Sequence, residues 1–140
     1  MANTLGIIKP DAVRRRLVGR IIQRIEQEGL ILRGMKVQRL SPEQARRFYA
    51  VHENKPFYKS LVDFMTSGPV VLMVIGGHRS IERWRDLMGA TDPAKAKYNT
   101  IRREFGTSIE RNVVHGSDSP ETARFEVGFF FRDDEILPKE

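Results

Sequence analysis

Hydrophobic residues follow two spacings in the first third of the chain, and each spacing predicts a type of element. A short apolar run over residues 4–9 stops at a proline, which cannot extend a sheet ladder, so the run is typical of a strand. Apolar residues then recur at every third or fourth position over 18–25, which predicts an amphipathic helix. Over 31–40 the pattern alternates, with Met35 and Val37 on one side, and predicts a strand with one solvated face.

The middle of the chain predicts two helices, a buried strand and a third helix. Residues 41–44, Ser-Pro-Glu-Gln, have the pattern of a capping box with proline at the first helical position. A break at Pro56 separates this helix from the next one. The nearly continuous apolar run over 69–75 is typical of a central strand buried on both faces, and residues 80–88 follow with helical spacing.

The last third combines a long irregular segment with two further predicted elements. A short helix over 100–105 precedes residues 112–119, whose glycine, serine, aspartate and asparagine are typical of a turn. Residues 119–121, Ser-Pro-Glu, predict the start of another helix. We expect this helix to change near Glu126 into a fourth, apolar strand that ends at Phe131.

The order of these elements predicts the fold class. Strand, helix, strand, two helices, strand, helices and strand, within a single domain over residues 1–140, fit the α+β class. The expected architecture is a ferredoxin-like βαββαβ sandwich, with an antiparallel four-stranded sheet and helices on one face. An inserted helical hairpin and a long loop before His115 complete the plan, and loops of that length usually carry function.

Composition excludes several classes of protein. The absence of cysteine excludes a disulfide framework, thiol catalysis and the usual zinc-finger ligands. The N-terminus shows no basic leader followed by a long apolar segment, and the apolar run over 70–75 is too short to cross a bilayer. We therefore expect a cytoplasmic protein without a membrane partner.

The net charge of +6 suits polyanionic partners such as nucleotides or nucleic acids. The basic residues are spread along the chain, so most of them are expected on a solvated surface. A basic nucleic-acid-binding module of ferredoxin-like fold, without catalysis, is an alternative. Because the strand over 70–75 lacks the aromatic residues of RNA-recognition sheets, nucleic-acid binding would be electrostatic and at most non-specific.

Residues 112–119, Asn-Val-Val-His-Gly-Ser-Asp-Ser, gather reactive side chains. A neutral imidazole can attack an electrophile without a separate base to deprotonate it, so His115 is the candidate nucleophile, and Gly116 leaves room beside the ring. A phosphoryl-transfer site also needs cations and neutral hydrogen-bond donors around the phosphates. The candidates are Lys9, Tyr49, His52, Arg85, Thr91, Arg102 and Asn112. For each of them a solvated surface charge or a packed helix face is the structural alternative.

The stretch around His115 closely resembles the active-site signature of nucleoside diphosphate kinases. The similarity extends from about Leu5 to Phe131 and includes further motifs in the family's order. Five separated motifs are much more specific than a lone His-Gly pair. The others are Ile7-Ile8-Lys9-Pro10-Asp11-Ala12-Val13, Tyr49-x-x-His52 with Lys55-Pro56-Phe57-Tyr58, Met88-Gly89-Ala90-Thr91-Asp92-Pro93, and Thr100-Ile101-Arg102.

This resemblance implies a ping-pong reaction, in which ATP or another nucleoside triphosphate gives its γ-phosphoryl group to His115 and a nucleoside diphosphate collects it. It also implies that Lys9 and Asn112 contact the ribose hydroxyls, and that Glu126 and Ser117 orient the imidazole. The nitrogen that is attacked stays open at this point. The same resemblance implies phosphate contacts from His52, Arg85, Thr91 and Arg102, with Tyr49 close to His115.

The resemblance also implies the rest of the nucleotide site. Phe57 resembles the residue that stacks on the base, and Ile109 takes the position of its apolar counterpart. Because an apolar clamp tolerates any base, broad base and sugar tolerance is expected. Mg²⁺ is expected on the nucleotide phosphates, with Asp118 reaching it through water and no all-protein metal cage. Family members are homo-oligomers, and a hexamer is favoured over a tetramer.

Some positions depart from the family's usual pattern without removing a catalytic group. Gly76 stands where an acidic residue is common, Asn99 where glycine usually precedes Thr-Ile-Arg, and Glu104 where aspartate is frequent. Asparagine tolerates left-handed backbone better than most residues, so the turn at Asn99 is expected to survive. A catalytically silent protein of the same fold is a further alternative, but the full set of reactive positions argues against it.

Overall fold

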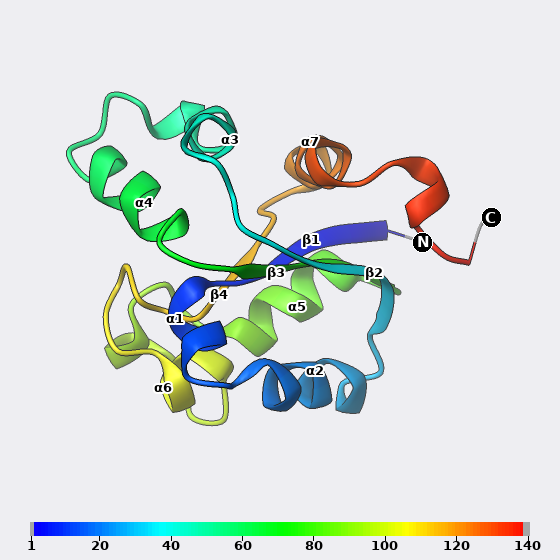
Figure 1. Ribbon diagram of the computed structural model, residues 1–140. Helices are drawn as coiled ribbons and strands as arrows, with labels where there is room; N and C mark the ends of the chain where they lie inside the picture. The colour runs from blue at the N-terminus through cyan, green and yellow to red at the C-terminus, as the bar shows by residue number, and fades with distance from the viewer. Residues whose placement is uncertain (1, 139–140) are drawn as a thin grey trace.

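The structure, a computed structural model, describes residues 2–138, whose strands form one antiparallel sheet (Figure 1). The strand order is β2-β3-β1-β4, so β3 and β1 are central and β2 and β4 lie at the edges. The strands are β1 (Ala2–Ile8), β2 (Ile31–Gln38), β3 (Val70–Gly77) and β4 (Val114–Gly116).

Helices connect the strands and cover the sheet. Among residues 2–138, no helix has the length and apolar character that crossing a membrane requires. The α-helices are α1 (Pro10–Arg14), α2 (Val18–Gln27), α3 (Pro42–Phe48), α4 (Tyr58–Met65), α5 (Ser80–Met88), α6 (Ile101–Phe105) and α7 (Pro120–Phe130), with 3₁₀ turns at Ala50–His52, Pro93–Lys95 and Asp133–Glu135.

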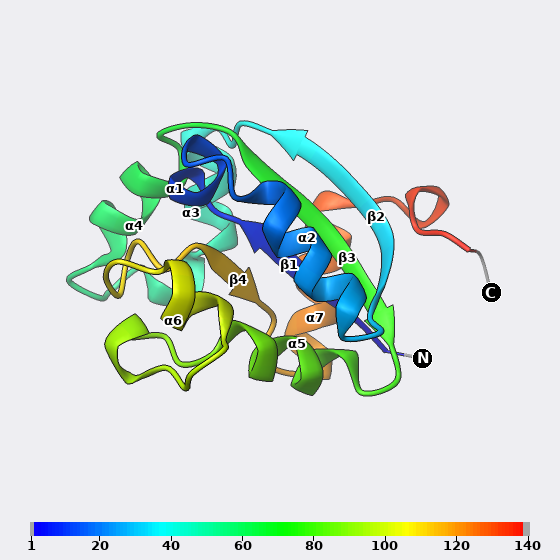
Figure 2. The ribbon, with the colours of Figure 1, turned by 90° about the horizontal axis from the view of Figure 1, so that it is seen from below.

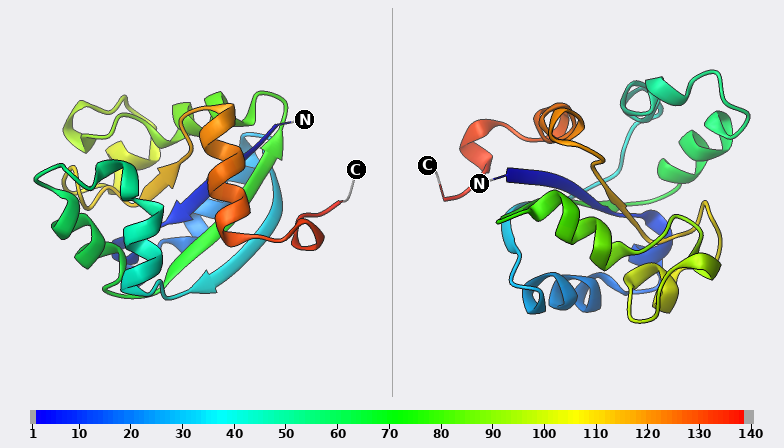
Figure 3. Two further views of the ribbon diagram at one scale, coloured as in Figure 1. Left: turned by 90° about the horizontal axis from the view of Figure 1, so that it is seen from above. Right: turned by 180° about the vertical axis from the view of Figure 1, so that it is seen from behind.

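The helices form a layer on each face of the sheet. Seen from below, α2 and α5 lie across the strands (Figure 2), and seen from above, α7 crosses the opposite face with α3 and α4 beside it (Figure 3). The ferredoxin-like α+β class is confirmed. The expectation that helices cover one face is wrong, because the hairpin of α3 and α4 and the helix α7 shield the second face.

The central strand β3 shows why both faces need covering. All eight of its residues are buried, as the apolar run predicted. Val71, Met73 and Ile75 pack into a core with α2 and α5, whereas the alternate residues pack against α3, α4 and α7. A strand without a polar face is stable when both sides are removed from water. The fold therefore has two cores separated by the sheet.

The fourth strand does not lie where the sequence predicted. Residues 126–130 continue α7, Phe131 is its C-cap, and β4 is the three-residue strand at Val114–Gly116, inside the segment expected to be a turn. The Ser119 hydroxyl accepts a hydrogen bond from the Thr122 amide at 3.2 Å, so the predicted helix start is confirmed. The buried residues Ala123, Glu126, Val127 and Phe130 then recur at helical spacing.

Two local features predicted from the sequence, the capping box at Ser41 and the turn at Asn99, are present in the structure. Ser41 and Gln44 form the predicted capping box, with Ser41 Oγ accepting from the Gln44 amide at 3.1 Å. Asn99 has a φ of 67°, so it takes the left-handed conformation that glycine usually supplies. On β2, however, the solvated side carries Met35 and Val37, which are 53% and 70% exposed.

Candidate active site

A cavity of about 590 Å³ opens beside the end of β1, between the α3–α4 hairpin and the long segment before β4. Its walls come from parts of the chain that are far apart in sequence. Most of the candidate residues face it, and Ser117 and Glu126 lie behind His115 rather than in the wall. The predicted residues in the wall are Lys9, Tyr49, His52, Phe57, Arg85, Thr91, Arg102, Ile109, Asn112, His115 and Asp118.

The sheet brings the two ends of the chain together at this site. His115 in β4 pairs with Ile7 in β1, so the residue after β1 lies next to the histidine strand. That residue, Lys9, donates its amide to the Val113 carbonyl at 2.8 Å. Val113 has a φ of 68°, an unusual conformation for a β-branched residue and one typically found at functional sites.

His115 is fixed by a carboxylate from α7. Its Nε2 lies 2.9 Å from Glu126 Oε1, and the Ser117 hydroxyl donates to the same oxygen at 2.8 Å. We assign the ring proton to Nε2, because a carboxylate accepts hydrogen bonds. Within residues 2–138 no protein group hydrogen-bonds to Nδ1. The imidazole is therefore oriented at one nitrogen and left with a free lone pair at the other.

The backbone of β4 is fixed from the other side by α5. The Trp84 indole Nε1 donates to the His115 carbonyl at 3.2 Å. A side chain at Gly116 would meet the Trp84 ring at 2.7 Å and Met88 Cε at 2.6 Å. Packing against α5 therefore requires glycine at this position; Gly116 also lines the cavity, and the room that it leaves for a substrate beside the imidazole stays a prediction.

Arg102 places a buried cation in the cavity wall. Its guanidinium donates to the Gly89 carbonyl at 2.9 Å and to the Val114 carbonyl at 2.8 Å, while Nε has no partner among the described residues. Burial, and then the nearby charge of Arg85, lower the pKa of Arg102 to about 10, so it remains charged at neutral pH. Arg85 itself, on α5, pairs with Asp118 at the cavity wall.

Lys9 and Asn112 form a second polar group in the wall. Lys9 Nζ donates to Asn112 Oδ1 at 2.7 Å, and Asn112 Nδ2 donates to the Thr91 carbonyl at 2.9 Å. Burial, and then repulsion from Arg102, lower the pKa of Lys9 to about 8, although the carboxylates of Asp11 and Glu110 oppose this shift. Lys9 is therefore charged at neutral pH and loses its charge as the pH rises through about 8.

Among residues 2–138, three buried polar atoms in the cavity wall have no hydrogen-bond partner: Tyr49 Oη, His52 Nδ1 and Arg102 Nε. Tyr49 caps the end of α3 and His52 ends the 3₁₀ turn that follows, so they do not share an α-helical face, and their rings stack with centroids 6.5 Å apart. Burial, and then the Glu126 charge, raise the pKa of Tyr49 above its usual range, so its hydroxyl stays a donor. Unpartnered buried groups are costly, so their concentration here indicates a polar ligand.

The mouth of the cavity is apolar. Phe57, between α3 and α4, is 45% exposed, and Ile109, in the segment before β4, is 61% exposed. Both line the same cavity, so they form two walls of a slot, named the nucleoside slot below. An aromatic ring and an aliphatic side chain at such an opening suit a planar heterocycle.

Sequence reasoning missed two residues of the wall, Glu110 and Leu61. Leu61 carries no chemical signal of its own. Glu110 stands between Ile109 and Asn112, which were both singled out, and that position is the signal that could have identified it.

No cluster in the described part of the chain could hold a metal ion by itself, since no three His, Cys, Asp or Glu side chains gather there. Asp118 lines the cavity, but its carboxylate is paired with Arg85. This donor set fits a divalent cation that arrives on the phosphates of a ligand, and does not fit an all-protein site.

The fold and the cavity together define an enzyme that binds a phosphorylated, base-containing ligand beside an oriented histidine. The family model for nucleoside diphosphate kinase matches residues 2–136. The chain is 52% identical to a nucleoside diphosphate kinase of Desulforapulum autotrophicum, over 98% of this chain and 99% of that protein. It is 58% identical to one of Bordetella pertussis, over 91% of each.

Solved structures agree with this result. The Aquifex aeolicus nucleoside diphosphate kinase superposes with a TM-score of 0.94 at 44% identity, covering 97% of this chain and 99% of that one. A Halobacterium salinarum nucleoside diphosphate kinase in complex with CDP gives 0.95 at 42% identity, covering 99% and 92%. The chain belongs to the nucleoside diphosphate kinase family, so the resemblance noted in the sequence and the enzyme class are confirmed.

Proposed function

We propose that this enzyme moves the γ-phosphoryl group of a nucleoside triphosphate to a nucleoside diphosphate through a phosphohistidine at His115. One observation carries the proposal: the imidazole is held through Nε2 by Glu126 and has a free Nδ1 beside a cavity with unpartnered donors. Membership of the family supports the phosphotransferase reaction itself. The orientation of the ring supports Nδ1 as the nucleophile in this proposal.

The proposed phosphoryl transfer through His115 has two steps. The Nδ1 lone pair forms a bond to the γ-phosphorus while the bond to the β–γ bridging oxygen breaks, and that oxygen leaves with the nucleoside diphosphate. The proton stays on Nε2, where the Glu126 carboxylate stabilises the positive charge that develops on the ring. In the second step a terminal oxygen of another diphosphate attacks the phosphohistidine and Nδ1 recovers its lone pair.

The cavity wall supplies groups for the phosphates and the ribose. Arg102 and Tyr49 are buried next to the histidine, where polar interactions are stronger than in water, and the half-buried His52 lines the same cavity. We assign Arg85 and Thr91 to the phosphates as well. Lys9 and Asn112 are already hydrogen-bonded to each other and present an ammonium and an amide to the ribose hydroxyls.

The base is assigned to the nucleoside slot between Phe57 and Ile109. Since neither wall selects a hydrogen-bonding pattern, every base, on ribose or deoxyribose, is expected to be accepted. The complex of the Halobacterium salinarum relative with CDP shows that this relative holds a pyrimidine nucleotide. Mg²⁺ is proposed to come with the nucleotide and to stabilise the charge of the phosphates, with Asp118 approaching through water.

We propose a homo-oligomer because the edge strand β2 exposes apolar side chains. Ile31, Met35 and Val37 are exposed on this strand, which has no neighbour on its outer side in the described sheet. An edge strand with exposed apolar side chains is a site at which another chain can pair. A hexamer is favoured over a tetramer, and a cytoplasmic location remains our prediction.

The alternative of a nucleic-acid-binding module without catalysis is not favoured. Lys9 and Arg102 are only 7% and 8% exposed and line a cavity, so they do not present their charges on an outer surface along which a nucleic-acid backbone could run. Binding to nucleic acid is therefore expected to be non-specific and to disappear as salt is raised.

The proposed function is tested with ATP and a series of nucleoside diphosphates in a coupled assay. Double-reciprocal plots should be parallel, as a ping-pong reaction requires, and the variant His115→Asn should lose transfer completely. Full turnover by His115→Asn would contradict the proposal. Absence of transfer by the natural sequence would instead favour the catalytically silent alternative.

A further inference from the structure

The two walls of the nucleoside slot belong to separate segments of the chain. Phe57 lies in the hairpin between α3 and α4, and Ile109 lies in the segment between α6 and β4. Two contacts connect these segments directly after Ile109. The Ser60 hydroxyl on α4 donates to Glu110 Oε2 at 2.7 Å, and the Arg111 guanidinium lies 5.6 Å from the centre of the Phe64 ring.

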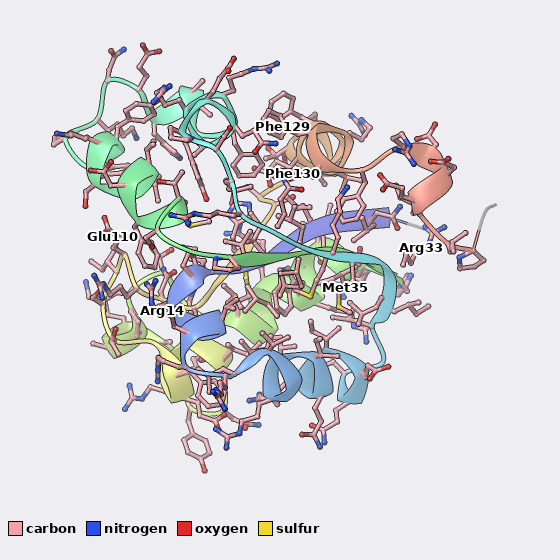
Figure 4. The ribbon with its side chains drawn as sticks, viewed as in Figure 1. Arg14, Arg33, Met35, Glu110, Phe129 and Phe130 are labelled. Atoms are coloured by element: carbon pink, nitrogen blue, oxygen red, sulfur yellow. The ribbon has the colours of Figure 1, made fainter. Side chains whose placement is uncertain are left out.

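The position of Glu110 is visible in Figure 4, where its side chain lies between α4 and the segment that leads to β4. Glu110 also lines the cavity, so its carboxylate is next to the site where a nucleotide is proposed to bind. It therefore connects the two walls of the slot at the edge of the cavity itself.

The two ends of α4 differ in how they are held. Val62, Phe64 and Met65 in its second half are buried in the core, whereas Phe57 and Ser60 at its start are exposed. Tyr58 at its start packs partly buried against the same core, and its hydroxyl donates to the Arg46 carbonyl at 3.1 Å, so these contacts hold the start of α4 toward α3 and not toward the segment that carries Ile109. The hydrogen bond from Ser60 to Glu110 joins this exposed face of the turn to the opposite wall.

We propose that Glu110 is a positioning residue for the nucleoside, because its hydrogen bond with Ser60 sets the separation of Phe57 and Ile109. This inference rests on the proposed function and adds a determinant of nucleotide affinity to it. A hydrogen bond to a carboxylate is stronger than one between neutral groups, and its loss lets the start of α4 move away. A wider slot grips the base less tightly, while the phosphates keep their own contacts.

The test compares Ser60→Ala with Ser67→Ala, a matched serine on the turn after α4 whose hydroxyl donates to Phe64 within its own segment. Ser60→Ala should raise the KM and the calorimetric Kd for nucleoside diphosphates by about three- to tenfold, as expected for one hydrogen bond. Ser67→Ala should keep the values of the natural sequence. Inhibition by tripolyphosphate, which has no base, should be the same in all three proteins.

Variants of Glu110 distinguish the effect of its hydrogen bond with Ser60 from a direct effect of its charge on the ligand. Glu110→Gln keeps an oxygen that can accept from Ser60, so it should lose less affinity than Glu110→Ala. Ser60→Ala combined with Glu110→Ala should lose little more than Glu110→Ala alone, because both changes break the same bond. If Glu110→Gln matches Glu110→Ala while Ser60→Ala binds normally, the carboxylate acts through its charge and the proposal is overturned.

Two further outcomes distinguish this inference from the proposed function. Normal nucleotide affinity in Ser60→Ala, with the natural sequence active, would overturn the positioning role and leave the reaction intact. An equal weakening of tripolyphosphate and nucleotide binding would also overturn it, because the contact would then serve the phosphates. The calorimetric comparison remains valid even if the natural sequence shows no transfer.

Discussion

The reactivity of His115 depends on a single carboxylate oxygen. Glu126 Oε1 receives hydrogen bonds from the ring and from Ser117, which is completely buried and also accepts from the Leu5 amide. The ring is therefore connected through Glu126 and Ser117 to the central strand β1. This arrangement holds the ring in place before a substrate arrives, so little reorganisation is needed during the reaction.

Replacing Glu126 by Gln should keep the shape of this contact and remove its charge. We expect kcat to fall about 10- to 100-fold, because the amide no longer stabilises the positive ring or fixes the proton on Nε2. The rate of His115 phosphorylation in a single turnover measures the effect. Glu121→Gln, on the exposed first turn of α7, is the control and should retain its rate, whereas an unaffected Glu126→Gln would show that the orientation of the ring matters little.

Lys9 predicts the pH dependence of the enzyme. Burial, and then Arg102, lower its pKa to about 8, so the side chain is charged below this pH and loses its charge above it. We expect kcat/KM to fall as the pH rises through about 8, because kcat/KM reports the free enzyme. In Lys9→Arg this decline should move to higher pH. A flat profile from about pH 7 to pH 9 would contradict the assignment.

At the scale of elements, the interface of β4 with α5 determines the geometry of the site. Gly116 packs against Trp84, and the same helix carries Arg85 into the cavity wall. The packing of β4 against α5 therefore requires that position 116 carries no side chain.

Gly116→Ala should destabilise the protein by about 1–3 kcal/mol, because the rigid Trp84 ring has to move. Since α5 moves with it, the affinity for nucleotides should fall as well. Urea unfolding and nucleotide titration measure the two effects. Gly128→Ala, where a methyl group would meet no atom within 4 Å, is the control and should unfold at the same urea concentration or a higher one.

Most elements could be predicted from the sequence because they have a clear period or cap, as at Ser41 and over residues 69–75. The strand β4 could not, since three residues are too short to show an alternation. The end of α7 was misread because Phe129, Phe130 and Phe131 favour strands, but tertiary packing of a helical stripe outweighed that propensity. The sequence predicted that the strand over residues 69–75 is buried on both sides, and this already implied helices on both faces of the sheet.

The candidate site was largely predictable, because its residue types are distinctive and most of them line one cavity. The sequence could not show what depends on geometry. It gave no means to choose between Nδ1 and Nε2 of His115, because that choice follows from where Glu126 lies. The link between Ser60 and Glu110 joins positions 50 residues apart and has no sequence pattern.

At the scale of the whole molecule, the two cores leave one apolar surface uncovered. Helices shield both faces of the central strands, but at the edge strand β2 Met35 and Val37 lie uncovered on the face that carries α2 and α5 (Figure 4, Met35). The positive net charge limits non-specific association, so a specific contact between copies is the simplest explanation for this strip.

Val37→Lys should shift the protein toward smaller species, because a charge at the strand edge opposes pairing with a second copy. Light scattering coupled to size-exclusion chromatography measures the mass directly. Val51→Lys is the matched control, since Val51 is 80% exposed and lies away from β2, and it should keep the mass of the natural sequence. A monomeric natural sequence, or an unchanged Val37→Lys oligomer, would contradict the proposed interface.

The most direct test of the central claim is the intact mass of the protein after incubation with ATP and Mg²⁺, and again after a nucleoside diphosphate is added. We predict that the protein gains the mass of one phosphoryl group, which is lost in acid and is absent in His115→Asn. The added diphosphate should then remove this group completely. Transfer between nucleotides without any phosphorylated protein, or with the group on another residue, would contradict the account.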